Sequence, residues 1–404
     1  MNETAQDSNK TAKVVTTAAL SSIFIYSLVV SLPAILINEV VDAFSLQGTD
    51  EGLMGSMTSL GFMISLLFTV LVQGRVKKIT ILIIAPMVQA LMLLFSGFSP
   101  TFVLFCIGCL FLGFSGGFID STANSAIVDV RKHESTRYLG YLHGLFGVGS
   151  LSAPLIFIWV QRYIDWRGVH YSLAIVSLLV IAFIFILTRR AGNVHVKQTQ
   201  REHLFTKSDL LAYLRIRRNV ALSLAGFFAM FAIACTTIWI VRYMTLRYDA
   251  AGLGVLSISV YWICSTANRF LLSQLIKRAP MKFFALGAAL STISLLFGIF
   301  SGSPVVLCAM MGVFGFCSGH FIPVLVSECA AGYEGHTTFT TSFLMFVMCI
   351  ARIVSPLMIA FVSTQISLTL GMMLPIAAAL SAMFCGWLAI QDRETVHLSS
   401  SQDR

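Results

Sequence analysis

The sequence predicts an all-α membrane protein in which twelve transmembrane helices form two six-helix pseudo-repeats. The chain has 404 residues, of which 57% are hydrophobic and only 11% charged, whereas soluble domains carry about 25% charged residues. It contains twelve apolar runs, and a bilayer-spanning helix needs about 20 apolar residues. Part of the first half is also repeated in the second half. These three observations define the expected architecture.

The twelve runs fall into two groups of six on either side of a polar segment. They are too long and too uniformly apolar for barrel strands, which need only about ten alternating residues each. We therefore expect helices at about 14–37, 52–73, 79–98, 102–128, 137–160, 171–188, 219–241, 252–276, 281–301, 304–330, 337–362 and 367–390.

The domain organisation follows from this grouping. We expect an N-terminal six-helix bundle over 1–190 and a C-terminal six-helix bundle with a short tail over 219–404. A cytoplasmic linker at 191–218 joins them. The linker is polar, and the amphipathic spacing at 205–218 predicts a surface helix there.

The internal repeat appears when the sequence is shifted by 203 residues. Over 103–120 against 306–323, seven of eighteen positions are identical. The clearest match is Ser-Gly-Gly-Phe-Ile-Asp at 115–120 against Ser-Gly-His-Phe-Ile-Pro at 318–323. Two such halves in the same orientation are the parallel-repeat arrangement of membrane transporters whose solute site lies near the membrane midplane.

The basic residues fall in alternate loops, which predicts the topology. By the positive-inside rule these loops are cytoplasmic, so we expect both termini inside and the chain in the plasma (inner) membrane. The net charge of +9 then reflects topology rather than nucleic-acid binding. The basic positions are Arg75, Lys77 and Lys78, then Arg131, Lys132 and Arg137, then eight between Arg189 and Arg218, then Lys277, Arg278 and Lys282.

All nine cysteines lie inside predicted spans. Cys106-x-x-Cys109 has no His or acid nearby, so we interpret it as packing rather than a metal or redox site. We expect no metal, no cofactor and no disulfide. The chain also has no ATP-binding loop, which leaves ion coupling or facilitated diffusion as energy sources.

Asp120 is an acid near the middle of a long apolar run. Asp129 marks the cytoplasmic end of that run, so Asp120 lies about 14 Å inward, near mid-membrane. Gly116, Asp120 and Asn124 recur every four residues and share one helix face. An intramembrane acid is a functional-site hypothesis by default, and we interpret this face as a polar stripe lining a water-filled cavity. The alternative is a structural hydrogen bond or ion pair between helices.

Arg352 is the opposite charge at similar depth in the eleventh run. A guanidinium keeps its charge in proteins. Three interpretations remain open: an anchor for a substrate carboxylate or phosphate, a partner for Asp120, or a gate residue.

Four further residues are candidates. His143 and His320 can relay protons because histidine titrates near neutral pH, although either could instead be a packing residue. We interpret Arg269 as a structural clamp near the cytoplasmic gate, with Glu328 as its candidate partner. Arg75 lies in the basic turn after the second run.

Several motifs resemble one transporter family. They are the glycine-rich run Gly113-Phe-Ser-Gly-Gly-Phe-Ile-Asp120-Ser-Thr-Ala-Asn124, the run His143-Gly-Leu-Phe146-Gly147-Val-Gly149 with Pro154, Asn268-Arg269, Phe321-Ile-Pro323 and Ile353-Val-Ser-Pro356. Together they resemble the fucose–proton symporter branch of the major facilitator superfamily. In that family the helix 4 acid is associated with sugar binding and proton coupling, and only Asp120 matches it here.

The sequence departs from this family in ways that shape the expectation. Residues 14–37 contain no acid, and Ile350-Ala351-Arg352 stands where the family has a glycine cluster. The superfamily signature after helix 2 survives as Gly74-Arg75-Val76-Lys77-Lys78. We therefore expect a non-enzymatic secondary transporter that imports a small polar solute, a sugar or a sugar-like or organic anion, with protons. We expect it to act as a monomer in the bilayer.

Two alternatives remain: a transporter that works in the opposite direction and a protein of another class. Ala153-Pro154 after Gly147 is a weak version of the Gly-Pro pattern of superfamily antiporters, which keeps proton-driven efflux as the second hypothesis. Gly113-Phe-Ser115-Gly116 also has the form of the serine motif of intramembrane proteases. Ser115 is repeated as Ser318 in a strip of small residues, however, and such strips are expected at helix contacts in membranes.

Overall fold

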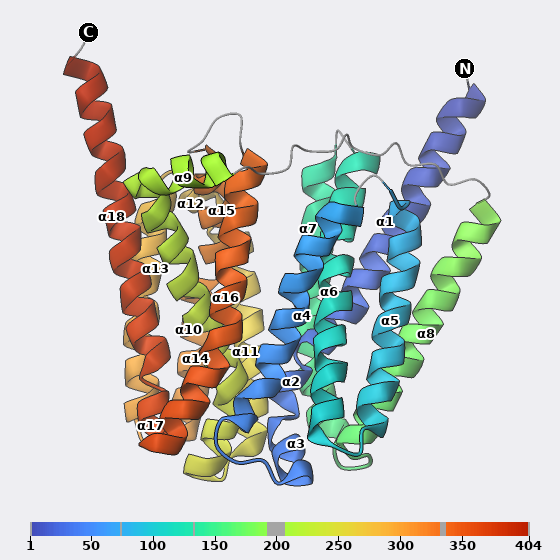
Figure 1. Ribbon diagram of the computed structural model, residues 1–404, viewed down its shortest axis with the longest axis horizontal. Helices are drawn as coiled ribbons and strands as arrows, with labels where there is room; N and C mark the ends of the chain where they lie inside the picture. The colour runs from blue at the N-terminus through green and yellow to red at the C-terminus, as the bar shows by residue number, and fades with distance from the viewer. Residues whose placement is uncertain (1, 73–74, 132–133, 192–206, 332–336, 403–404) are drawn as a thin grey trace. The chain divides into compact units, whose positions relative to one another are not determined.

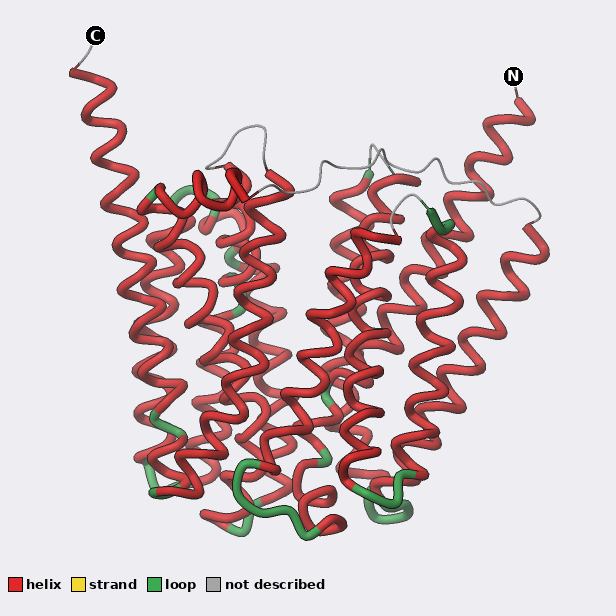
Figure 2. The backbone as a smooth tube through the Cα atoms, in the orientation of Figure 1, coloured by secondary structure: helices red, strands yellow, loops and turns green. Residues whose placement is uncertain are grey.

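The computed structural model describes residues 2–72, 75–131, 134–191, 207–331 and 337–402. Every secondary-structure element among them is an α-helix (Figures 1 and 2), as the sequence predicts. Eleven helical segments in these ranges are long and apolar enough to cross a membrane. The predicted run at 252–276 is also helical, as one long and one four-residue helix, but its serines, Asn268 and Arg269 make it less apolar than the other eleven.

The chain divides into two compact units. The first contains residues 1–46 and 53–202, and the second contains 47–52 and 203–404. The helices of the first unit are α1 (Asn2–Val30), α2 (Leu32–Ile35), α3 (Ile37–Phe44), α5 (Lys78–Phe98), α6 (Phe102–Val130), α7 (Ser135–Val160) and α8 (Trp166–Ala191). Helix α4 (Asp50–Val72) begins in the short segment that groups with the second unit.

The second unit holds the remaining helices. They are α9 (Lys207–Arg215), α10 (Arg217–Tyr248), α11 (Ala251–Leu271), α12 (Ser273–Ile276), α13 (Pro280–Phe300), α14 (Pro304–Ser318), α15 (Phe321–Ala331), α16 (Thr337–Gln365), α17 (Leu368–Gly371) and α18 (Leu374–Gln402). Helix α9 lies within the predicted surface helix at 205–218 and is held to its unit by the buried Tyr213, whose ring contacts Phe343.

The sequence repeat is also a repeat of packing. In the first unit α1 packs against α6, α7 and α8, and α5 packs against α6 and α8. In the second unit α10 packs in the same way against α14, α16 and α18, and α13 packs against α14 and α18. Both α6 and α14 begin at a hydroxyl cap, because Thr101 accepts from the Leu104 N–H and Ser303 from the Val306 N–H.

Four predicted spans are interrupted in the structure: the eighth and twelfth near one end, and the first and tenth at breaks that bear on the site. The first breaks at Ser31 and Leu36, around Pro33, which lacks the N–H needed to continue the helix. The tenth breaks at Gly319 and His320 between α14 and α15. Apolarity continues through both breaks, so hydropathy alone did not predict them.

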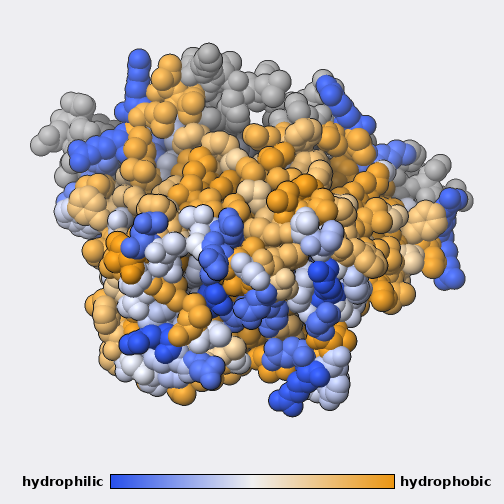
Figure 3. All heavy atoms as spheres, turned by 60° about the horizontal axis from the view of Figure 1, so that its bottom comes forward, coloured by the Kyte–Doolittle hydropathy of each residue, from blue (hydrophilic) through white to orange (hydrophobic). Residues whose placement is uncertain are grey.

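Apolar side chains of the described residues form a core in each unit. The core of the first unit includes Ile23, Leu82 and Ile119, and that of the second includes Leu222, Phe284 and Leu325. Figure 3 shows hydrophilic residues gathered on the face turned toward the viewer, with hydrophobic residues around and behind them. This distribution fits helices that cross a bilayer and end in water.

Candidate functional site

Asp120 and Asn124 lie one turn apart on α6, in the first unit. The Asn124 amide Nδ2 donates to the Asp120 carbonyl oxygen at 2.8 Å and to its carboxylate Oδ1 at 3.3 Å. Both side chains are half-buried. The structure therefore brings together the two residues that the i, i+4 spacing predicted to be neighbours.

The same face of α6 meets α1 at Gly116. A Cβ at this position would overlap the ring of Tyr26, so the glycine lets that ring lie against α6, one turn from Asp120. The neighbouring Ser115 is buried, and its hydroxyl donates to the Leu112 carbonyl at 2.9 Å within the helix. These contacts fit a strip of small residues that packs helices together. They favour a packing role for Ser115 over that of a protease serine.

The two candidate histidines differ in their surroundings. His143 lies on α7 with an exposed side chain. His320 is buried at the break between α14 and α15, where Nδ1 is 3.3 Å from Asn268 Oδ1 and Nε2 is 3.1 Å from the Phe283 carbonyl oxygen. Both ring nitrogens of His320 thus contact protein atoms, as expected of a packing histidine.

The candidate arginines also differ. Arg352 is half-buried on α16, one turn before Pro356. Arg269 donates from Nε to the Gly319 carbonyl at 2.9 Å, at the break in the tenth span. Arg75 is exposed in the turn after α4.

The suggested pairing of Arg269 with Glu328 is wrong. Glu328 forms an ion pair with Arg218 at the start of α10. Arg218 lies 110 residues earlier in the chain, so the sequence offered no local signal for this partner. In the first unit Lys78 Nζ lies 2.7 Å from the Asp129 carboxylate. Each unit thus ties the end of its fourth span to another helix by an ion pair.

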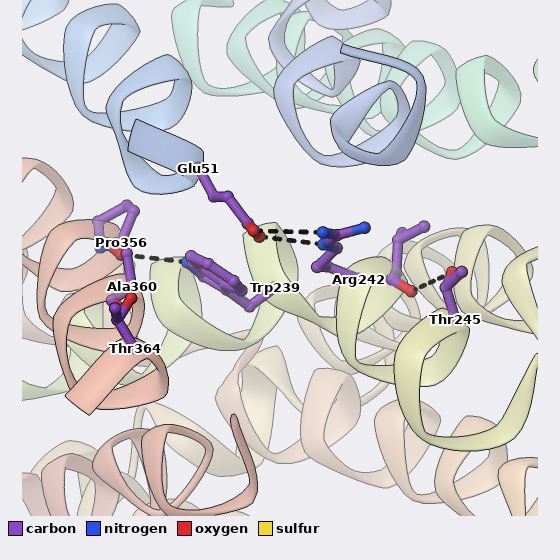
Figure 4. A network of polar contacts seen from close by, with 8 residues as sticks. Glu51, Trp239, Arg242, Thr245, Pro356, Ala360 and Thr364 are labelled. Atoms are coloured by element: carbon purple, nitrogen blue, oxygen red, sulfur yellow. Dashed lines mark hydrogen bonds and ion pairs between the residues drawn. The ribbon is translucent and has the colours of Figure 1, made fainter. Parts of the chain in front are cut away.

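A further ion pair in the second unit was not predicted from the sequence. Glu51, in the segment 47–52, accepts from Arg242 Nε at 3.0 Å and from Nη2 at 3.2 Å (Figure 4). Beside this pair the Trp239 indole donates to the Pro356 carbonyl at 3.2 Å. Gly52 lies so close to Pro356 that a Cβ would be 2.6 Å from the same carbonyl oxygen.

No group of three His, Cys, Asp or Glu side chains among the described residues is arranged to hold a metal ion. The candidate site therefore consists of polar and charged side chains on apolar helices. Asp120 and Asn124 are grouped in one unit, and Arg352 lies in the other.

Comparison with known proteins identifies the class of this protein. The model of the Major Facilitator Superfamily matches residues 17–356, so the chain belongs to that family of membrane transporters. No curated protein matches the chain by sequence.

Solved structures of transporters share the fold. A point mutant of the nucleoside transporter NupG has a TM-score of 0.78 at 12% identity, covering 94% of this chain and 99% of that one. A bacterial homologue of the human lysosomal transporter Spinster has a TM-score of 0.75 at 13% identity, covering 95% and 98%. A point mutant of the E. coli fucose:proton symporter FucP has a TM-score of 0.64 at 17% identity, covering 93% and 98%.

Proposed function

We propose that this protein is a secondary transporter that imports a small polar solute together with protons, by alternating access. The observation that carries the proposal is Asp120, a carboxyl group deep in a 29-residue apolar helix and hydrogen-bonded to Asn124. Burying a carboxylate in a membrane is costly, and retained intramembrane acids mark proton and substrate pathways. The resemblance to the fucose:proton symporter supports the same role for Asp120.

The proposed solute is a sugar or a sugar-like or organic anion. Hydroxyl groups can bond to Asp120 and Asn124, and a fixed guanidinium at Arg352 suits a carboxylate or phosphate. We further propose that His143 belongs to the proton pathway, that the protein acts as a monomer in the inner membrane, and that both termini are cytoplasmic.

The experiment begins by finding a ligand. Thermal unfolding of the purified protein with sugars, nucleosides, sugar acids and organic acids identifies a solute that stabilises the native state. That solute is then used in proteoliposomes to compare gradient-driven accumulation with solute exchange at equilibrium.

In that assay Asp120→Asn should lose proton-driven accumulation while keeping exchange. Asp129→Asn, on the same helix but paired with Lys78, is the matched control and should keep the pH dependence of transport. Wild-type accumulation by the Asp120→Asn variant would refute the proposed coupling. An antiporter moves protons and solute in opposite directions. Solute accumulation that requires an outward-directed proton gradient would therefore favour the efflux alternative.

A further inference from the structure

The break in the first span adjoins a small cavity inside the first unit. The cavity has a volume of about 20 Å³, and about 10–15 Å³ of such volume is enough for one water molecule. Its walls come from the broken first span and from α4, α6 and α8. The lining residues include Val29, Pro33, Met54, Cys109 and His170.

His170 lines this cavity and carries a hydrogen-bond acceptor. Its Nδ1 lies 2.8 Å from the Trp166 carbonyl oxygen. Because a carbonyl only accepts, Nδ1 carries the proton, and Nε2 of the neutral ring is an acceptor. The side chain is only 2% exposed, and no described residue bonds to its Nε2. The rings of Phe105 and Trp166, each 5.7 Å away, fix the imidazole in place.

The second hydrogen-bond acceptor is a backbone carbonyl that loses its donor because of Pro33. In a continuous helix the N–H of residue 33 would donate to the carbonyl of Val29, four residues earlier. Pro33 has no N–H, so the helix leaves this carbonyl without its usual donor. Val29 and Pro33 both line the cavity. A buried acceptor without a donor is costly, and ordered water commonly satisfies it.

We propose that this cavity is a binding site for one structural water molecule, which donates to His170 Nε2 and to the Val29 carbonyl. The water replaces the hydrogen bond that Pro33 removes and so bridges the broken first span to α8. The cavity volume excludes larger solutes, and its two acceptors select a hydrogen-bond donor. This site does not depend on the proposed transport activity.

X-ray radiolysis of the purified full-length protein tests the proposal, because it turns bound water into hydroxyl radicals that oxidise adjacent side chains. Met54 and Cys109 line the cavity but are only 4% and 3% exposed. Met281 and Met348 are similarly inaccessible, at 5% and 2% exposure, and lie in the second unit, so they provide the internal reference. Met54 should be oxidised several-fold faster than either reference. Equal rates would overturn the proposal.

Variants that change either proposed acceptor of the water molecule provide the second test. His170→Phe removes the acceptor, and Pro33→Ala returns an N–H to Val29. Each should lower oxidation of Met54 to the reference rate. His170→Gln keeps an acceptor near the same place and should preserve the oxidation of Met54. His143→Phe, outside the cavity, is the matched control. If His170→Phe does not fold, Pro33→Ala alone decides. Unchanged oxidation of Met54 in Pro33→Ala would refute the site.

Discussion

The carboxylate of Glu51 and the guanidinium of Arg242 face each other in a two-pronged ion pair, with N–O distances of 3.0 and 3.2 Å. Their side chains are only 15% and 12% exposed, so the pair is largely removed from water. Glu51 lies in the first turn of α4, in the segment that groups with the second unit. The pair therefore anchors this short segment to α10.

Breaking this pair should destabilise the protein. Glu51→Gln removes the counter-charge that faces the largely buried Arg242, and losing one member of such a pair costs about 2–5 kcal/mol. Thermal unfolding in detergent measures the effect. The double variant Glu51→Gln with Arg242→Gln should be less destabilised than the sum of the single variants. Glu134→Gln, in the exposed pair with Arg137, is the control and should change little. Additive single effects would contradict the coupling.

Glu39 should make stability depend on pH. Burial raises the pKa of this α3 carboxyl above its ordinary value, and Asp42 adds to the rise, although the Glu39 backbone N–H opposes it. Its Oε2 has no hydrogen-bond partner among the described residues. The folded state therefore holds the proton more tightly than the unfolded state does. Stability falls as pH rises from the ordinary carboxyl pKa through the raised pKa.

Glu39→Gln removes this cost of ionisation. The variant should melt at a higher temperature than the wild type near neutral pH, where the wild-type carboxyl is ionised at a cost. The two should melt alike at a pH below the ordinary carboxyl pKa. Asp42→Asn, on the same helix but exposed, should raise the melting temperature less. A Glu39→Gln variant that melts no higher than the wild type near neutral pH would contradict the assigned cause.

The two histidines should separate into a structural and a functional role. His320→Gln should lower the melting temperature, because both ring nitrogens contact protein atoms in the buried break and unmaking such bonds costs about 1–3 kcal/mol. His143→Gln should leave the melting temperature unchanged, because His143 is exposed, and should shift the pH optimum of transport. A shared phenotype for the two variants would refute this division.

The fold was largely predictable from the sequence, because bilayer-spanning helices require long apolar runs and the two halves share matching residues. The breaks in the first and tenth spans could not be predicted from hydropathy, because they depend on contacts. Pro33 was visible in the sequence, but the Gly319–His320 break is marked by partners on other helices, the Arg269 bond to Gly319 and the His320 contact with Asn268.

The site was predictable only where its residues are neighbours along one helix. Asp120 and Asn124 are one turn apart, so helical periodicity places them together. Glu51 and Arg242 are 191 residues apart, and no sequence signal joins them. Glu328 was assigned to Arg269 from its place at the inner end of the span, but it forms its ion pair with Arg218.

Variants of Arg352 test whether the solute is an anion. If a substrate carboxylate or phosphate binds its guanidinium, Arg352→Gln should abolish stabilisation by an anionic ligand, and Arg352→Lys should restore only part of it, because an ammonium cannot form the two parallel hydrogen bonds. If the solute is neutral, Arg352→Gln should leave binding intact and mainly change the pH dependence of transport. Thermal unfolding of both variants with the solute and with its uncharged analogue distinguishes these outcomes. We expect the anionic case, because Arg352 stands where the neutral-sugar transporters that the chain resembles have a glycine cluster. Unchanged binding of a neutral sugar by Arg352→Gln would overturn this expectation.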